Sequence, residues 1–168
     1  METLLEILAV VGIIETIILV LGLVWGFSLW VKGIFPALLR LGNGLAKRQI
    51  AVFAKGDNLG SIKNLLIDSK LFNKKNICEI TKSGDVGRAE NATMYLVVWH
   101  DWAEDIDDIL RQKRDGCALI VYAPYDRGRI PDEQMKKLDG KRHTAVTNFR
   151  GRLLNDIVAS LITTSYEK

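Results

Sequence analysis

The chain has 168 residues, with 23 basic and 20 acidic side chains and a formal net charge of +3. This near balance, and the scatter of the basic residues along the chain, argue against a nucleic-acid-binding protein, which usually presents a clustered basic surface. If the first fifty residues belong to a membrane, about 118 residues remain, which is enough for one compact domain with its own core.

The N-terminal part of the chain reads as a membrane span. Residues 7–31 are all apolar or small except Glu15, Thr16 and Ser28. A helix of this length spans about 37 Å, more than the roughly 30 Å hydrocarbon core of a bilayer. The acidic start and the length of the apolar run disfavour a cleaved signal peptide. We therefore predict a transmembrane helix over residues 1–32.

The flanking charges predict the orientation of this helix. Lys32, Arg40, Lys47 and Arg48 follow the apolar run, and no basic residue precedes it. By the positive-inside rule, the C-terminal part then lies in the cytoplasm. The expected protein is a single-pass protein of the cell inner (plasma) membrane, with the lipid membrane as one partner.

One face of the span carries unusual residues. On a helix, Gly22 and Gly26 each point within about 20° of Glu15. A carboxyl group inside an apolar span usually faces protein or water, and glycines four residues apart let helices approach closely. This pattern predicts a homo-oligomer with Glu15 near its centre, in one version a pore. The alternative is a span that begins at Thr16, with Glu15 among the outer headgroups.

Residues 33–48 form the next predicted unit. At helical spacing, their apolar side chains form a stripe beside Arg40 and Lys47, which is typical of an amphipathic helix lying on the inner leaflet. We expect Gly42-Asn43-Gly44 to end or bend this helix.

Residues 49–168 alternate strand and helix signals. The predicted strands cover residues 50–54, 77–80, 94–99, 117–123 and 144–149, and the predicted helices cover residues 61–72, 103–114, 132–138 and 152–164. The fully apolar run at 94–99 is typical of a central parallel strand. The pattern predicts an α/β domain with a five-stranded parallel sheet covered by helices on both faces.

Metal and cofactor signals are missing from the sequence. Cys78 and Cys117 lie in apolar runs and predict free thiols, and His100 and His143 are far apart. The glycines of residues 55–60 do not follow a dinucleotide or phosphate-loop pattern. We therefore expect no metal and no resident cofactor.

In a parallel sheet, ligands bind outside the carboxyl ends of the strands, near the point where the strand order reverses. For the order 2-1-3-4-5, the turns at that edge supply six candidate ligand-binding residues: Lys55, Asp57, Asn58, Asp101, Arg150 and Arg152. The start of the last helix would favour a phosphate, and two guanidiniums would add charge-assisted bonds. Alternatively, the arginines pair with Asp57, Asp101 or Asp126.

The order and spacing of these elements resemble the flavodoxin-like domains, which include receiver and TIR domains. The receiver pattern is met only in part: Asp101 follows the third strand and Asp57 lies near the first, but the expected hydroxyl and lysine are replaced by Ala123 or Pro124 and by Arg150. Asp101 also has the spacing of a capping box with Glu104, which predicts a helix cap.

The TIR resemblance implies NAD cleavage by a glutamate. Glu104 matches by position, but the serine and tryptophan context before it does not.

The architecture resembles small bacterial defence effectors that join a transmembrane segment to a nucleotide sensor. It implies a membrane-anchored receptor or effector, in one version acting in antiviral defence, whose domain binds a ligand such as a nucleotide second messenger, or a protein partner. Binding would control self-association or opening of the helices. The alternatives are a TIR-like enzyme at the membrane and a scaffold that binds only proteins.

Overall fold

A computed structural model describes the backbone of residues 2–127 and 129–164. The described side chains are those of residues 9–36, 42, 45, 47–127 and 129–164. By its internal contacts the chain divides into two units, Met1–Leu41 and Gly42–Lys168.

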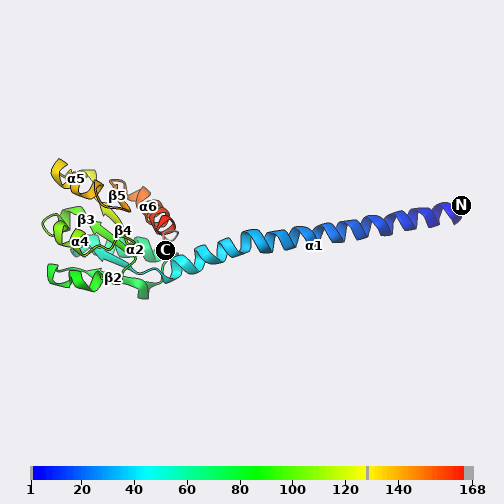
Figure 1. The fold of residues 1–168 in the computed structure, drawn as a ribbon, viewed down its shortest axis with the longest axis horizontal. Coiled ribbons are helices and arrows are strands. Elements are labelled where there is room, and N and C mark those ends of the chain that lie inside the picture. The colour runs from blue at the N-terminus through cyan, green and yellow to red at the C-terminus, as the bar shows by residue number, and fades with distance from the viewer. Residues whose placement is uncertain (1, 128, 165–168) are drawn as a thin grey trace. The chain divides into compact units, whose positions relative to one another are not determined.

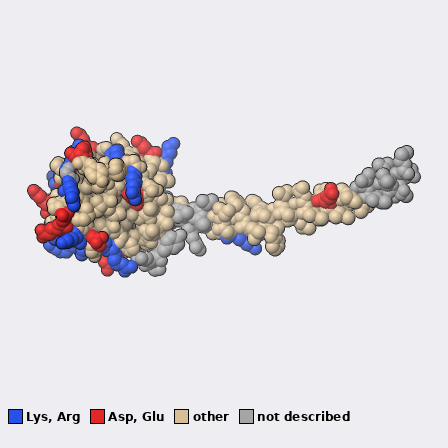
Figure 2. All heavy atoms as spheres, turned by 90° about the horizontal axis from the view of Figure 1, so that it is seen from above, with Lys and Arg blue, Asp and Glu red and all other residues tan. Residues whose placement is uncertain are grey.

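The first helix, α1, runs without interruption from Glu2 to Lys47. Its stretch Ala9–Pro36 has a mean hydropathy of 2.4, and none of it is buried within the chain. This one N-terminal helix is therefore long and apolar enough to cross a membrane. Figure 2 shows the stretch as an almost uniformly uncharged surface, in contrast with the mixed charges of the domain.

The helix does not end at Gly42-Asn43-Gly44, because α1 continues to Lys47; a bend at these residues stays a prediction. Each glycine in a helix costs about 1 kcal/mol relative to alanine. Leu45, one turn further on, packs against a hydrophobic cluster of the α/β domain and offsets part of that cost. The interfacial position of residues 33–48 stays a prediction, and the side chains of residues 37–41 in its apolar stripe lie outside the described residues.

Five parallel strands form a single sheet: β1 (Ile50–Phe53), β2 (Ile77–Ile80), β3 (Met94–Val98), β4 (Ala118–Tyr122) and β5 (Thr144–Thr147). Their order is β2-β1-β3-β4-β5, which confirms the predicted α/β class and strand order. Figure 1 shows the strands of the sheet with helices around them. The central strands β1 and β3 are buried along their whole length, because both sheet faces are covered.

Helices cover each face of the sheet through a separate hydrophobic cluster. On one face, α2 (Gly56–Asp68) and α6 (Arg150–Thr163) bury Leu66 and Ile157. The other face is covered by the 3₁₀ helix η2 (Ser83–Ala89), α3 (Trp99–Trp102), α4 (Ile106–Gln112) and α5 (Asp132–Asp139). The short 3₁₀ helices η1 (Lys74–Asn76) and η3 (Tyr125–Arg127) lie in connecting loops.

Two helices differ from the sequence prediction. The predicted helix over 103–114 is the shorter helix α4, and a separate short helix, α3, begins at Trp99, which was expected to be the last residue of a strand. The rings of Trp99 and Trp102 are buried, and Trp102 packs edge-on against Phe53 with 5.4 Å between the ring centroids. Helix α2 begins at Gly56 rather than at residue 61, so the expected turn at 55–58 is its first turn.

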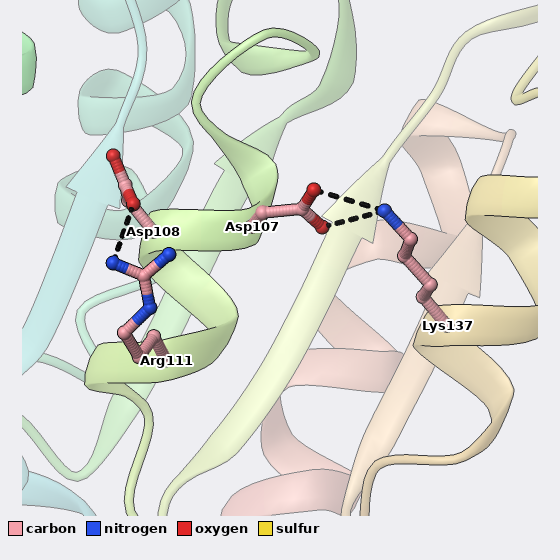
Figure 3. A network of polar contacts seen from close by, with 4 residues as sticks. All are labelled: Asp107, Asp108, Arg111 and Lys137. Carbon is pink, nitrogen blue, oxygen red and sulfur yellow. Dashed lines mark hydrogen bonds and ion pairs between the residues drawn. The ribbon is translucent and has the colours of Figure 1, made fainter.

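Polar contacts on the surface tie α4 to α5. Lys137 on α5 donates to both carboxylate oxygens of Asp107 on α4, at 3.0 and 2.9 Å (Figure 3). Asp108 and Arg111 form a second ion pair within α4 at 3.2 Å. These pairs are largely exposed, so each contributes at most about 1 kcal/mol.

Both cysteines are free thiols. Cys117 is buried just before β4, and burial raises the pKa of its thiol to about 11. Cys78 on β2 is only partly buried. A thiol kept neutral in this way is chemically inert, which fits a structural role for Cys117.

The first residue of α2 offers a test of local backbone geometry. Gly56 has a φ of +51°, in the left-handed region where a side chain costs roughly 1–2 kcal/mol. We predict that Gly56→Ala lowers the free energy of unfolding by about 1 kcal/mol or more, although nothing lies within 4 Å of an added Cβ. Denaturant unfolding of the detergent-solubilised chain, followed by tryptophan fluorescence, measures the change.

The matched control is Gly60→Ala, four residues further along α2. It also has open space around an added Cβ but no positive φ. Alanine there should raise stability by roughly 0.5–1 kcal/mol, as expected within a helix. Equal effects of the two substitutions would contradict the backbone explanation.

Candidate functional site

A polar network joins the carboxyl ends of β1 and β3. The carboxylate of Asp101, in α3, accepts a hydrogen bond from the Lys55 backbone N–H at 2.8 Å. It also accepts from the Asn58 side-chain amide at 2.9 and 3.0 Å. Lys55 is the residue that precedes α2, so Asp101 places a negative charge at the positive end of that helix.

This geometry corrects the capping-box prediction for Asp101. Asp101 lies inside α3 rather than before it, and the cap position of α4 belongs to Asp105. The Asp101 carboxylate therefore satisfies a donor at the N-terminus of α2, more than forty residues earlier in the chain. The α2 end is already occupied by a protein anion, which places any second anion elsewhere along the edge.

A pocket of about 160 Å³ lies beside this network. Its polar wall comes from α2, the loop after β4, and α6, through Asn58, Ser61, Asp126, Arg127 and Arg150. Its apolar wall is formed by Ile62, Val98, Tyr122 and Pro124. The volume is below the roughly 300 Å³ at which drug-sized ligand pockets begin, and suits a small anionic group.

Two guanidinium groups line the pocket. Arg150 donates to the Ser61 carbonyl at 2.9 Å, and Arg127 donates to the Asn58 side-chain oxygen at 3.2 Å. A guanidinium has five N–H donors, and each of these contacts uses one of them. The remaining donors suit phosphate or carboxylate oxygens, for which arginine provides paired, charge-assisted bonds.

Of the six predicted ligand residues, four lie in the pocket or in the network beside it, and two lie elsewhere. Asn58 and Arg150 line the pocket, and Lys55 and Asp101 belong to the adjoining network. Arg152 instead turns along α6 to Asp156, at 3.2 Å. Asp57 is exposed in the first turn of α2 and is not among the pocket-lining residues.

The alternative pairing of the arginines with acids across the edge is also not what the structure shows. Arg150 contacts a backbone carbonyl, and Arg152 pairs with an acid of its own helix. Glu104, the residue singled out by the TIR resemblance, is exposed between α3 and α4 and does not line this pocket.

An exposed aromatic pair lies beside the pocket. Tyr125 and Phe149 follow β4 and β5, and their rings meet edge to face with 5.4 Å between centroids. They are 71% and 62% exposed, which is unusual for large apolar rings. A second pocket of about 370 Å³ is lined by Tyr125 together with Ile130, Met135 and Asn148.

Sequence reasoning missed Arg127, Ser61 and the aromatic pair. Arg127 and Tyr125 lie in the turn after the fourth predicted strand, at the carboxyl edge. That position is the signal by which the sequence could have identified them as site residues. Ser61 contributes only a backbone carbonyl to Arg150, a role that any residue type can fill. Among the described residues, no cluster of three or more His, Cys, Asp or Glu side chains could hold a metal ion.

Comparisons with protein-family models, curated proteins and solved structures give no match for this chain. The chemistry of the carboxyl-edge pocket and of α1 therefore carries the functional inference.

The Asp101 network makes a stability prediction. Asp101→Ala leaves the Lys55 N–H and the Asn58 amide without their acceptor, so we expect a loss of about 1–3 kcal/mol in unfolding free energy. Asp105→Ala is the matched control, because Asp105 makes no side-chain cap hydrogen bond to α4. It should change stability by no more than about 0.5 kcal/mol. Comparable losses in both variants would contradict the role given to Asp101.

Proposed function

We propose that this chain is a membrane-anchored receptor whose α/β domain binds a phosphorylated ligand at the carboxyl edge of its sheet. Binding controls the self-association of the α1 helices. The observation that carries the proposal is the pocket that both Arg127 and Arg150 line, with walls from α2, α6 and the loop after β4. The apolar helix Ala9–Pro36 supports the membrane anchor.

A nucleotide is the ligand class that the surroundings favour. The 160 Å³ pocket has room for a phosphate but not for a whole nucleotide. The exposed rings of Tyr125 and Phe149 provide an aromatic surface on which a base can stack. The loop of residues 123–131 contributes to both pockets, so one ligand can contact the arginines and the rings together.

Helix α1 presents a continuous seam for self-association. Residues on it recur at alternating spacings of three and four: Gly12, Glu15, Leu19, Gly22, Gly26, Leu29 and Gly33. This is the heptad spacing of helices that wrap around one another. Every glycine of Ala9–Pro36 falls on this seam, where small residues let two backbones approach.

Glu15 lies on the same seam. In an assembly it would be removed from lipid, which lowers the cost of a carboxyl group within the span. A pore lined by Glu15 is one form that such an assembly can take. Thr16 beside it donates to the Gly12 carbonyl at 2.7 Å, so its hydroxyl is satisfied within the helix.

The proposed location is the inner membrane of the cell, with the α/β domain in the cytoplasm. Lys32, Lys47 and Arg48 follow the apolar stretch, as the positive-inside rule requires for that orientation. A role in signalling, including antiviral defence, is compatible with this plan of ligand-binding domain and anchor.

Ligand binding is tested by calorimetry with a panel of mono- and dinucleotides, NAD included, on the detergent-solubilised chain. We predict that Arg150→Gln weakens binding by about 10- to 100-fold, because a charge-assisted bond contributes roughly 1.5–3 kcal/mol. Arg152→Gln is the control, since this arginine lies two residues away and pairs with Asp156. Absence of nucleotide binding, or equal losses in both variants, would refute the pocket.

The same preparation separates the alternatives. NAD consumption that disappears in Glu104→Ala would indicate a TIR-like enzyme instead. A protein partner retained by Arg150→Gln, with no nucleotide bound, would indicate a scaffold.

Self-association is tested on the seam itself. We predict that Gly22→Ile with Gly26→Ile shifts the detergent-solubilised oligomer toward monomer, with at least a tenfold weaker association, because bulky side chains keep the helices apart. Within the chain itself, nothing lies within 4 Å of a Cβ added at Gly22 or Gly26. Ser28→Ile, off the seam, should leave the mass measured by light scattering unchanged. A monomeric native chain, or an oligomer indifferent to all three changes, would contradict the seam.

A further inference from the structure

Because all five strands are parallel, their amino ends lie at one edge of the sheet and their carboxyl ends at the other. All helix-to-strand connections lie at the amino ends of the strands, in residues 48–49, 69–76, 90–93, 113–117 and 140–143. We call this surface the amino edge. It carries eight basic residues and two acidic ones, Glu90 and Asp115. A surplus of six positive charges on one edge contrasts with +3 for the whole chain.

Including the last residue of each helix that ends there does not remove this surplus. Lys47 adds one positive charge, and Asp68 and Asp139 add two negative ones, so nine basic residues face four acidic ones. Most of the remaining acidic residues lie on helix surfaces, as Asp107 and Asp108 do on α4 (Figure 3). The positive charge is therefore concentrated at the amino edge.

The loop between α2 and β2 combines charge with an exposed apolar side chain. Lys70, Lys74 and Lys75 are exposed, and Leu71 between them is 39% exposed. Leu71 is one of three exposed large hydrophobic residues described in the α/β domain; the other two are the aromatic pair at the opposite edge. Basic residues around an exposed leucine are typical of surfaces that sit at a lipid interface.

A second basic group lies before β4 and β5. The Lys113 ammonium donates to the Arg142 carbonyl at 2.8 Å, which brings the two loops together. Burial lowers the pKa of Lys113; Cys117 and Asp115 act in the opposite direction, and the like charges of Lys141 and Arg142 lower the pKa further. A nearby anionic surface would relieve the repulsion within this group.

The amino edge is also where the chain enters the sheet. Strand β1 begins three residues after the end of α1, the helix that holds the proposed span. We propose that the amino edge docks on an anionic lipid surface, with lysines at the headgroups and Leu71 in the interface. This inference rests on the cytoplasmic placement given under Proposed function, because the cytoplasmic leaflet carries the anionic lipids.

Hydrogen exchange on the full chain tests the docking. The protein is placed in nanodiscs of phosphatidylcholine alone, or of phosphatidylcholine mixed with phosphatidylserine. We expect slower amide exchange in residues 69–76 and 113–117 with phosphatidylserine, and unchanged exchange in the carboxyl-edge loop 123–131. Raised salt should abolish the difference, because exposed charges are screened.

Removing charges at different positions tests whether docking depends on the amino edge itself or only on the total charge of the domain. Lys74→Gln with Lys75→Gln should lower the ratio of docked to undocked domain roughly thirtyfold, given the attraction of each basic residue to an anionic surface. Lys82→Gln with Arg152→Gln removes the same charge from exposed positions that follow the carboxyl ends of β2 and β5, and should leave the protection intact. Protection that is independent of phosphatidylserine, or lost equally in both variants, would overturn the proposal. Nucleotide binding at the carboxyl edge is measured separately, so either idea can fail alone.

Discussion

The parallel pairing of all five strands is the constraint on which the rest of the molecule depends. A parallel pair needs a crossover between its strands, and the crossovers here bury both faces of β1, β3 and β4. The same pairing sends every strand end to one edge and every strand start to the other. The domain thus has two chemically different edges: a carboxyl edge with a pocket and a basic amino edge.

In the proposed receptor, the two edges of the sheet serve different purposes. The chain enters at the amino edge, after α1, and the ligand pocket lies at the opposite ends of the strands. Membrane attachment and ligand binding then do not compete for one surface. The pocket walls belong to α2, α6 and the loop after β4, so a ligand held there would contact three segments of the domain at once.

In the proposed receptor, Asp101 restricts where on the carboxyl edge an anionic ligand would bind. Its carboxylate occupies the N-terminus of α2, the position that a phosphate would otherwise favour. Asn58 connects this network to the pocket, since its amide donates to Asp101 and its oxygen accepts from Arg127. The cationic site is therefore displaced toward α6, where Arg150 lies.

Local patterns were sufficient for most of the secondary structure. The apolar runs located all five strands to within two residues, since a strand buried on both faces is apolar throughout. They failed at Trp99 and at Gly56, where the chain leaves the sheet. An aromatic residue at a strand end suits the strand and the helix equally, and the packing of Trp102 on Phe53 decides between them.

The sequence by itself determined the apolar stretch of α1, its glycine seam, the positions of the five strands and the turns in which polar residues gather. These features depend on composition and on short periodic spacings, which any local reading can detect. Only the tertiary structure decided that Arg150 lines the pocket while Arg152 does not, and that Asp101 serves α2 rather than its own helix. The contacts of Asp101 with Lys55 and of Arg150 with Ser61 join residues that are 46 and 89 positions apart, and local spacing carries no information about such pairs. The Arg152–Asp156 pair, by contrast, joins residues four positions apart on one helix.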